Sequence, residues 1–313
     1  MKILITGGAG FIGSHLVEHF QQEATEIRIL DNLSTGSPTN LTGLDYHLIE
    51  GSITDPVIVR EAVQDIDCVF HLAAMVSVAE SMDHADQCTE INVHGLLNVA
   101  REAAAAGIKK IIFASSAAVY GDNPATPKVE TMLPQPKSPY AVTKLDGEYY
   151  LEMFRSEGAI SSACLRFFNV FGPRQSPSSH YAAAVPIFMQ QAVRGEDLII
   201  HGDGEQSRDF IYIKDIVGAL VFAAKHENVQ GIYNAGYGRQ TTINELADSI
   251  ITSAASASRV RHEATRQGGV RHSLASIDKL TSAGWRAQFD LEQGLEATMA
   301  YFQDKNKLQD KPE

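Results

Sequence analysis

A glycine-rich turn near the start of the chain constrains the fold more than any other feature. The segment Thr6–Gly13 (TGGAGFIG) follows the short apolar run KILIT and precedes HLVEHFQQ, which reads as a helix. Gly7, Gly10 and Gly13 allow a tight turn and let the backbone approach a pyrophosphate at the helix N-terminus. The alternative is a loop that contains glycines by chance, but the strand before and the helix after it favour a dinucleotide-binding turn.

The acidic residue that closes the next strand indicates which dinucleotide binds. Asp31 ends the run EIRILD, where a carboxylate can accept hydrogen bonds from both adenosine ribose hydroxyls and would repel a 2′-phosphate. Asn32 follows it, where an arginine could have accommodated that phosphate. We therefore predict NAD, rather than NADP, as the cofactor.

The first half of the chain alternates short apolar runs with helical segments. This alternation predicts an α/β fold with a Rossmann-type doubly wound parallel sheet. Long helices are expected over residues 92–106 and 140–157. The runs that read as strands are KILIT, EIRILD, HLIEG, CVFHLA, KIIFASS and SSACLRF.

The texture of the sequence changes near residue 172, where loops with proline begin. We expect residues 1–172 to form the NAD-binding domain and residues 173–313 to form mainly a smaller C-terminal α/β substrate domain, with DLIIHG and GIYNAG among its short strands. Residues 209–228 are expected to pack back on the first domain. The charged end, residues 304–313, is expected to be disordered.

Composition narrows the classes of partner. A net charge of -12 argues against nucleic acid and membrane surfaces as partners held by general electrostatics. The first apolar run is too short for a signal peptide, and no apolar stretch reaches membrane-spanning length. We therefore predict a cytoplasmic protein.

Metal binding is not expected. The three cysteines form no CxxC pair and read as core thiols. His15 and His19 have a spacing that could chelate a metal, but no carboxylate or cysteine set accompanies them, so they read as helix-face residues.

The stretch SPYAVTK places a phenol and an amine on one helix face. Ser138 is a good N-cap and Pro139 suits the first helical position, so a helix is expected to start here. Tyr140 and Lys144 then lie one turn apart. Taken alone, the spacing would equally suit a solvated surface, and the surrounding motifs have to decide.

The ordered set of motifs resembles the extended short-chain dehydrogenase/reductase family. TGGAGFIG, HLAA, SSAAVYG and YAVTK occur in the family's order, and RFFNVFGP and HGDGEQSRDFIYIKD resemble its nucleotide-sugar branch, the UDP-sugar 4-epimerases in particular. The resemblance extends from Met1 to about Phe302. It implies an NAD-dependent isomerase that acts on a UDP-sugar, and it makes the smaller domain the UDP-sugar-binding one.

The resemblance implies a catalytic set of Ser116, Tyr140 and Lys144, with Ser115 as the competing serine. For tyrosine to act as a base near pH 7, its pKa must fall by roughly three units, about 4 kcal/mol. An ammonium about 4 Å away supplies energy of that order at an effective dielectric constant near 20, and the charge of NAD+ would add to it. We therefore expect Lys144 to lower the pKa of the Tyr140 phenol while also reaching the nicotinamide ribose.

The residues after this serine bear on the reaction. Related dehydratases carry an Asp-Glu pair there and related decarboxylases a Glu, whereas this chain has Ala117 and Ala118. This absence favours epimerisation at C4 over elimination. Ala118 also departs from the Ser or Thr of many 4-epimerases, which puts one sugar contact in doubt.

Further contacts follow only from the resemblance. The cofactor-binding set comprises Gly7, Gly10, Phe11, Ile12, Gly13, Asp31, Asn32, Ser52, Ile53, Leu72, Ala73, Ala74, Tyr140 and Lys144. The substrate-binding set comprises Ser77, Asn92, Ser116, Asn169, Ala184, Val185, Arg208, Arg266 and Ser273. Asn92 could equally be a helix-start residue, and Ser52 and Gly269 stand where the family usually has acids.

The sugar stays open at this stage. Ser273 occupies a gate position that is small in relatives admitting an N-acetyl group, so UDP-glucose, UDP-galactose and their N-acetyl forms rank together. A UDP-glucuronate 4-epimerase is the alternative enzyme, which Glu80 disfavours, and a catalytically inactive nucleotide sensor is the non-enzymatic alternative. The resemblance also implies a homodimer built on the two long helices.

Overall fold

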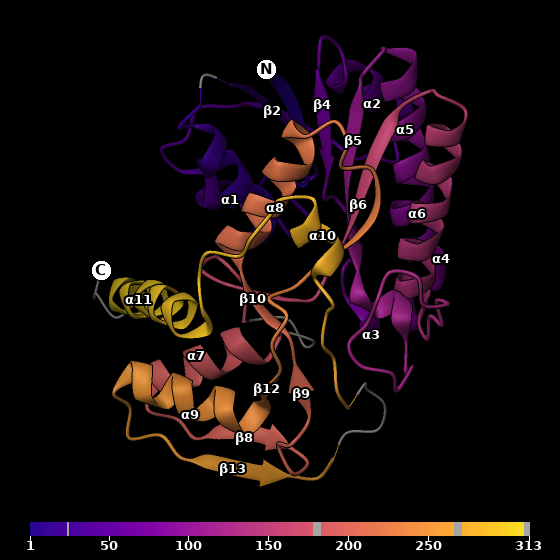
Figure 1. Ribbon diagram of the computed structural model, residues 1–313. Helices are drawn as coiled ribbons and strands as arrows, with labels where there is room; N and C mark the ends of the chain where they lie inside the picture. The colour runs from indigo at the N-terminus through magenta and orange to yellow at the C-terminus, as the bar shows by residue number, and fades with distance from the viewer. Residues whose placement is uncertain (24, 178–182, 266–270, 310–313) are drawn as a thin grey trace.

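The protein has two lobes, one built on a large sheet and one smaller (Figure 1). The structure is a computed structural model that describes residues 1–23, 25–177, 183–265 and 271–309. Arg266 and Gly269 therefore lie outside the described residues.

The larger lobe holds a parallel sheet. Among the described residues it has seven strands in the order β11-β6-β5-β4-β1-β2-β3, which is a doubly wound Rossmann-type topology. Every run predicted to be a strand in the first half is one. The strands are β1 (Lys2–Thr6), β2 (Glu26–Asp31), β3 (His47–Glu50), β4 (Cys68–His71), β5 (Lys110–Ser116), β6 (Ser161–Phe167) and β11 (Gly231–Ala235).

Helices cover both faces of this sheet because successive strand residues point to opposite sides. Ile3 and Ile5 pack with α1 (Phe11–Phe20) and α8 (Ile213–Lys225) in one core. Leu4 points into a second core on the other face. That face is covered by α2 (Pro56–Ala62), α5 (Gly95–Ala105) and α6 (Pro139–Ser156).

Short helical turns lie close to the carboxyl ends of strands. They are 3₁₀ turns at Pro38–Leu41 and Ala117–Tyr120, the helices α3 (Val78–Asp83) and α4 (Ala85–Thr89), and a π-helical turn at Glu90–His94 that leads into α5. The helix predicted from residue 92 thus begins as a π turn, a feature often found near functional sites.

The smaller lobe is α/β as well. The helices α7 (Ala184–Arg194), α9 (Ile243–Ala254) and α11 (Leu291–Gln309) pack on one another, and α10 (Asp278–Ser282) contacts β11. Two-residue to four-residue strands pair as β7 (Asn169–Phe171) with β10 (Phe210–Tyr212), β8 (Leu198–His201) with β13 (Val260–Glu263), and β9 (Ser207–Arg208) with β12 (Thr241–Thr242).

Two expectations about organisation need correction. GIYNAG, expected in the smaller domain, instead forms β11, which pairs with β6 and completes the large sheet. Residues 304–309, expected to be disordered, continue α11, because Met299 and Phe302 bury this helix against the core.

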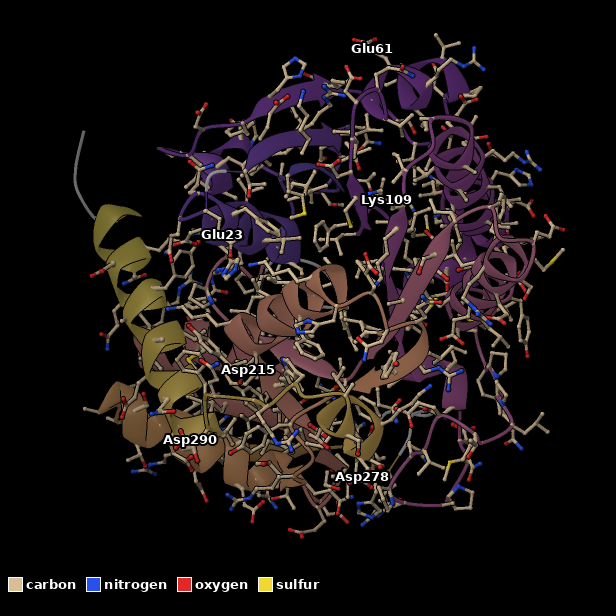
Figure 2. The ribbon with its side chains drawn as sticks, turned by 45° about the horizontal axis from the view of Figure 1, so that its top comes forward. Glu23, Glu61, Lys109, Asp215, Asp278 and Asp290 are labelled. Atoms are coloured by element: carbon tan, nitrogen blue, oxygen red, sulfur yellow. The ribbon has the colours of Figure 1, made fainter. Side chains whose placement is uncertain are left out.

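The segment 209–228 does contact the larger lobe. Its helix α8 packs against α1 and against β5 and β6. Asp215, labelled in Figure 2, lies at the start of α8. It accepts hydrogen bonds from the amides of Gln288 at 2.7 Å and Phe289 at 3.2 Å, which ties the approach to α11 onto the same helix. How the chain divides into domains stays a prediction.

The described residues contain neither a membrane-spanning helix nor a metal-binding cluster. None of their helices has both the length and the apolar character needed to cross a bilayer. No group of three or more His, Cys, Asp or Glu side chains among them is arranged to hold a metal ion.

Candidate active site

The glycine turn forms a cradle between β1 and α1. Gly7 has a φ of +72°, and a Cβ there would lie 2.8 Å from the amide nitrogen of Ala73, in the loop after β4. A Cβ on Gly13 would lie 2.2 Å from the carbonyl oxygen of Gly7. Within the described residues no side chain caps the N-terminus of α1, so its first amides face outward and suit a pyrophosphate.

Asp31 stands at the end of β2 beside this cradle. Its carboxylate accepts hydrogen bonds from the amides of Ala9 at 2.9 Å and Leu33 at 2.8 Å. Because each carboxylate oxygen has two lone pairs, both oxygens retain capacity for ribose hydroxyls. Asn32 is exposed and accepts hydrogen bonds from Ser34, so it stabilises the turn itself.

The remaining predicted cofactor residues line the neighbouring loops. Ser52 accepts a hydrogen bond from the amide of Thr54 and contacts its hydroxyl at 2.8 Å, whereas Asp55 caps α2. Ile53 is buried against Gly95 at the start of α5. The other cofactor candidates are half-buried at the carboxyl ends of β1 and β4, namely Phe11, Ile12, Leu72, Ala73 and Ala74.

The helix α6 begins as SPYAVTK predicts. Ser138 is its N-cap and accepts a hydrogen bond from the amide of Ala141 at 3.2 Å, and Pro139 is its first residue. The Lys144 ammonium lies 5.8 Å from the centre of the Tyr140 ring. Tyr140 and Lys144 are therefore brought together, as predicted.

The strand β5 brings the serine to the same place. The Ser116 side chain is hydrogen-bonded to the Tyr140 phenol and also accepts a hydrogen bond from the amide of Ala118 at 3.2 Å. The competing residue, Ser115, donates its hydroxyl hydrogen instead to the Glu148 carboxylate at 2.5 Å. Ser116 is thus the serine that shares the site with Tyr140.

The direction of the tyrosine pKa differs from the expectation. Burial raises the pKa of the Tyr140 phenol, and the hydrogen bond with Ser116 lowers it only in part. Burial also lowers the pKa of Lys144 to about 8, and this ammonium donates to the carbonyl oxygen of Ala114 at 2.8 Å. Burial is thus the largest influence on the phenol in the protein alone, and a lowering of its pKa by the neighbouring Lys144 charge stays a prediction.

Two positioning contacts were missed because they join distant parts of the sequence. The hydroxyl of Ser81, on α3, accepts a hydrogen bond from the backbone amide of Tyr140 at 3.2 Å. The Thr6 hydroxyl lies 2.9 Å from Nδ1 of His71, which is fully buried, and burial lowers the pKa of that ring to about 3. A buried neutral histidine thus contacts β1, and the positive charge of Lys144 lowers the pKa of His71 further.

Two predicted sugar contacts have structural partners. Ser77 is the N-cap of α3 and accepts a hydrogen bond from the amide of Glu80. Asn92 is 3% exposed; its oxygen accepts from the amide of Met75 at 2.8 Å, and its amide group donates to the carbonyl of Met75 at 3.0 Å and the hydroxyl of Thr143 at 3.0 Å. The Asn92 amide therefore fixes the loop after β4 onto α6, and its polar atoms are already occupied.

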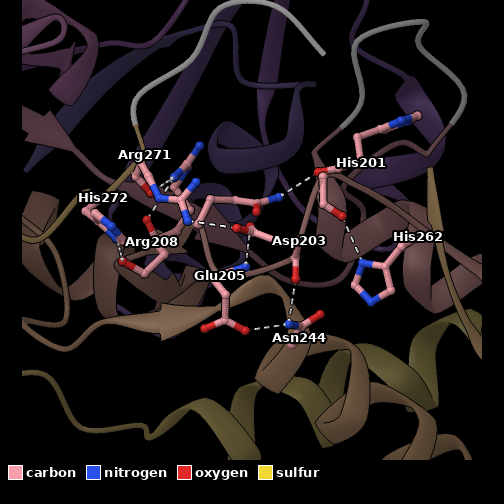
Figure 3. A network of polar contacts seen from close by, with 11 residues as sticks. His201, Asp203, Glu205, Arg208, Asn244, His262, Arg271 and His272 are labelled. Atoms are coloured by element: carbon pink, nitrogen blue, oxygen red, sulfur yellow. Dashed lines mark hydrogen bonds and ion pairs between the residues drawn. The ribbon is translucent and has the colours of Figure 1, made fainter. Parts of the chain in front are cut away.

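The remaining predicted substrate residues lie in or beside the smaller lobe. Arg208, on β9, donates to the carbonyl oxygens of Ser207 at 2.8 Å and Arg271 at 3.2 Å, and its neighbourhood is a dense polar network (Figure 3). Ser273 is bound to the same strand through its amide, which donates to Ser207. Asn169 begins β7, and Ala184 and Val185 begin α7.

This network holds side chains that the sequence did not single out. Arg271 is exposed and forms an ion pair with Asp203 at 2.8 Å, and the Ser207 hydroxyl lies 2.9 Å from Nδ1 of His272. Asp209 is buried, and its carboxylate accepts from three amides, including those of Tyr237 at 2.7 Å and Ala275 at 3.0 Å. Burial raises the pKa of Asp209 to about 6. No sequence signal separates these residues from surface charges.

Comparisons with known proteins agree with this geometry. The sequence profile of the NAD dependent epimerase/dehydratase family matches residues 3–236. A putative UDP-glucose 4-epimerase of Methanocaldococcus jannaschii is 34% identical over 307 residues, which cover 97% of this chain and 99% of that protein. A UDP-N-acetyl-alpha-D-glucosaminuronate decarboxylase of Bacillus cytotoxicus is also 34% identical, over 97% of this chain and 98% of its own.

Solved structures are similar over nearly the whole chain. The UDP-N-acetylglucosamine 4-epimerase of Methanobrevibacter ruminantium, in complex with UDP-N-acetylmuramic acid, has a TM-score of 0.93 and 37% identity, and the match covers 97% of this chain and 98% of that one. The UDP-glucose 4-epimerase of Thermotoga maritima with UDP-glucose has a TM-score of 0.93 and 36% identity, covering 98% and 100%.

Proposed function

The chain belongs to the NAD-dependent epimerase/dehydratase family, and from that premise we propose that it inverts the configuration at C4 of a UDP-linked hexose. The membership confirms the resemblance predicted from the ordered motifs, and with it the Rossmann-type fold and the dependence on NAD. The cradle fits that cofactor, because Gly7 and Gly13 leave room where a Cβ would clash, and Asp31 keeps acceptor capacity.

One observation carries the choice of reaction. Ser116, Tyr140 and Lys144 converge at the carboxyl end of β5, and the turn that follows Ser116 offers Ala117 and Ala118 in place of carboxylates. Elimination of water and decarboxylation both benefit from an additional acid or base there. A site with one phenol suits removal and return of a proton and a hydride at a single carbon.

Tyr140 acts as the base in this proposal. Its phenolate takes the proton of the sugar 4-hydroxyl, Ser116 donates a hydrogen bond to the same oxygen, and Lys144 contributes positive charge nearby. Bound NAD+ supplies a hydride acceptor and donor for C4, and a positive charge beside the phenol. After the 4-keto sugar has turned about its diphosphate link, Tyr140 returns the proton to the oxygen.

The UDP moiety is assigned to the smaller lobe. Arg208 supports this assignment, because a guanidinium can bind two phosphate oxygens at once and because its half-buried position would strengthen the attraction. Asn169 lies beside it in space, since its amides donate to the carbonyl oxygen of Asp209. Asn169 and Arg208 therefore lie close to the same short segment, residues 207–209, and we propose that the nucleotide binds beside it.

The proposed substrates are UDP-glucose and UDP-galactose, with the N-acetyl forms beside them. Relatives named for glucose and for N-acetylglucosamine are almost equally similar to this chain, and the small Ser273 is compatible with either. UDP-glucuronate is the second candidate, since a UDP-glucuronic acid 4-epimerase of Bacillus cereus is 29% identical with a TM-score of 0.90. The exposed Glu80 on α3, close to the helix that carries Tyr140, disfavours that anion.

We also propose a homodimer in the cytoplasm, as the sequence predicts. The outer face of α6 carries Val142, Tyr149 and Met153, which are 43%, 55% and 56% exposed. Their spacing puts them on one side of the helix. A second copy of the chain would cover this apolar stripe.

The test is a direct assay. The purified protein is incubated separately with UDP-glucose, UDP-N-acetylglucosamine and UDP-glucuronate, and the anomeric protons are followed by NMR. We expect the 4-epimer from at least one of the first two. Tyr140→Phe should lower turnover by a factor of about 10²–10⁴ and leave NAD binding unchanged. Tyr150→Phe, at a half-buried tyrosine of the same helix outside that apolar stripe, is the matched control. No epimer from any sugar, or a fully active Tyr140→Phe variant, would sink the proposal.

A further inference from the structure

A buried ion pair lies directly behind the catalytic helix. Glu148, on α6, and Arg166, on β6, form two hydrogen bonds, at 2.8 Å from Nε and 2.7 Å from Nη2, and their side chains are 0% and 2% exposed. The hydroxyl of Ser115, on β5, donates to the same Glu148 carboxylate at 2.5 Å. Three elements thus meet at one carboxylate.

Glu148 and Ser115 each lie close to a proposed catalytic residue on their own element, α6 and β5. Ser115 adjoins Ser116, and Glu148 follows Lys144 by one helical turn. The Lys144 ammonium donates to the carbonyl oxygen of Ala114, the residue before Ser115. The end of β5 is therefore held to α6 by two successive hydrogen bonds, one from the catalytic lysine and one to Glu148.

Arg166, the partner of Glu148 on β6, has further contacts that hold it in place. The Arg166 guanidinium lies 4.8 Å from the centre of the Tyr120 ring, and the Tyr120 hydroxyl donates to the side-chain oxygen of Asn234 at 2.6 Å. Asn234 donates in turn to the carbonyl oxygens of Lys128 at 2.9 Å and Ser276 at 3.1 Å. In the sheet, Ser115 pairs with Arg166 and Arg166 with Asn234, so the three lie in one row across β5, β6 and β11.

Stability alone gives a weak reason for such a group. Removing two charges from water is costly, and apolar residues of similar volume often stabilise a core as well as a buried ion pair does. A fixed, two-point hydrogen-bonded pair does set the relative position of the elements that carry it. The elements here carry the serine, the phenol and the amine of the proposed site.

We infer that Glu148, held by Arg166 and Ser115, is a positioning residue that fixes the register of α6 against β5 and so keeps Ser116, Tyr140 and Lys144 in working geometry. The inference rests on the proposed catalytic roles of those three residues. A slip of about 1 Å at reacting groups can cost about 10²-fold in rate. It would also weaken the bond between Ser116 and Tyr140, which lowers the pKa of the phenol.

The experiment uses the NAD-loaded enzyme and two variants with matched controls. Ser115→Ala removes one hydroxyl from the group. Ser162→Ala is its control, because Ser162 is also buried and donates to α6 at the carbonyl oxygen of Leu151, away from Lys144. Glu148→Gln removes the charge, and Glu152→Gln is its control, an exposed residue of the same helix that pairs with Arg155.

We expect kcat to fall about tenfold in Ser115→Ala and about 10²-fold in Glu148→Gln, with KM within about twofold of the wild type. The controls should keep kcat even where their melting temperature drops. The phenolate absorbance of Tyr140, obtained by subtracting the matching Tyr140→Phe protein, should appear at higher pH in Ser115→Ala and not in Ser162→Ala.

Several outcomes would overturn the inference. A folded Ser115→Ala protein with wild-type kcat and wild-type Tyr140 titration does so, as does an equal loss of kcat in Ser115→Ala and Ser162→Ala. If Glu148→Gln fails to fold, Ser115→Ala decides alone. If the wild type epimerises none of the sugars, the proposed function fails, while the Tyr140 titration still tests the positioning.

Discussion

The Lys144 ammonium lies 2.8 Å from the carbonyl oxygen of Ala114, inside the protein and beside the phenol that it serves. Burial lowers the pKa of this amine to about 8 and raises the pKa of Tyr140. Because the Lys144 ammonium lies 5.8 Å from the centre of the Tyr140 ring, loss of a proton from one group should change the proton affinity of the other, and we expect the two to titrate as a pair.

This coupling predicts the pH dependence of catalysis. In the active form Tyr140 is a phenolate and Lys144 is an ammonium. This form has one proton fewer than the fully protonated pair. We expect kcat/KM to rise with pH, up to about tenfold per unit, and to level off no higher than about pH 8, since added positive charge at the site moves the midpoint down. Lys144→Met should move the rise toward higher pH; an unchanged midpoint in that variant would contradict the coupling.

The cradle predicts a steric effect at Gly13. Gly13→Ala would put a Cβ 2.2 Å from the backbone oxygen of Gly7, so the turn must shift. We expect a loss of about 1–3 kcal/mol in the free energy of unfolding and weaker NAD binding, measured by denaturant titration and calorimetry. Gly218→Ala, in α8 with its nearest contact at 3.7 Å, is the control and should leave NAD binding intact.

The buried histidine predicts instability in acid. Burial lowers the pKa of His71 to about 3 in the folded chain, below the value of about 6.5 in an unfolded one, so the neutral ring stabilises the fold above pH 6.5 and this stabilisation is lost as pH falls toward 3. The loss between pH 7 and pH 4 should be roughly 3 kcal/mol.

Denaturant unfolding at pH 7 and pH 4 measures that loss. The difference in the free energy of unfolding between pH 7 and pH 4 should be smaller in His71→Gln than in the wild type. It should be unchanged in His94→Gln, because the His94 side chain is 59% exposed. An equal loss of unfolding free energy in the wild type and in His71→Gln would show that the acid sensitivity arises from other residues.

The stripe on α6 predicts a change of assembly. Met153→Asp puts a charge into the face proposed to pair with a second copy, so sedimentation should show a dimer becoming a monomer. Turnover should fall as well, because the same helix carries Tyr140. Val57→Asp, at an exposed valine on α2, is the control. A Met153→Asp protein that sediments like the wild type would remove α6 from the interface.

Local signals predicted much of the fold. The strands of the first half, the start of α6 at Ser138 and Pro139, and the turn at Gly7 each depend on neighbours in the chain, so propensity and spacing suffice to find them. The partner of β6 could not be found this way, because Asn234 pairs with Arg166 across a long stretch of sequence.

The sequence predicted which residues form the site better than it predicted their pKa values. Ser116, Tyr140 and Lys144 come together, but the raised pKa of Tyr140 depends on how deeply the fold buries it. From the sequence, Asn92 is either a sugar contact or a helix start. Its hydrogen bonds to Met75 and Thr143 show that it connects the loop after β4 to α6. Hydrogen bonds between residues far apart in sequence leave no periodic pattern in it, so they cannot be predicted from the sequence.

The strand β11 bears on how the chain is made. On the ribosome, β6 emerges well before residues 231–235, so its outer edge stays open while the segment from β7 to α8 is synthesised. An open edge of this kind readily pairs with other chains. A fragment that ends at residue 172 would keep that edge permanently, and we expect it to aggregate during expression rather than to bind dinucleotide on its own.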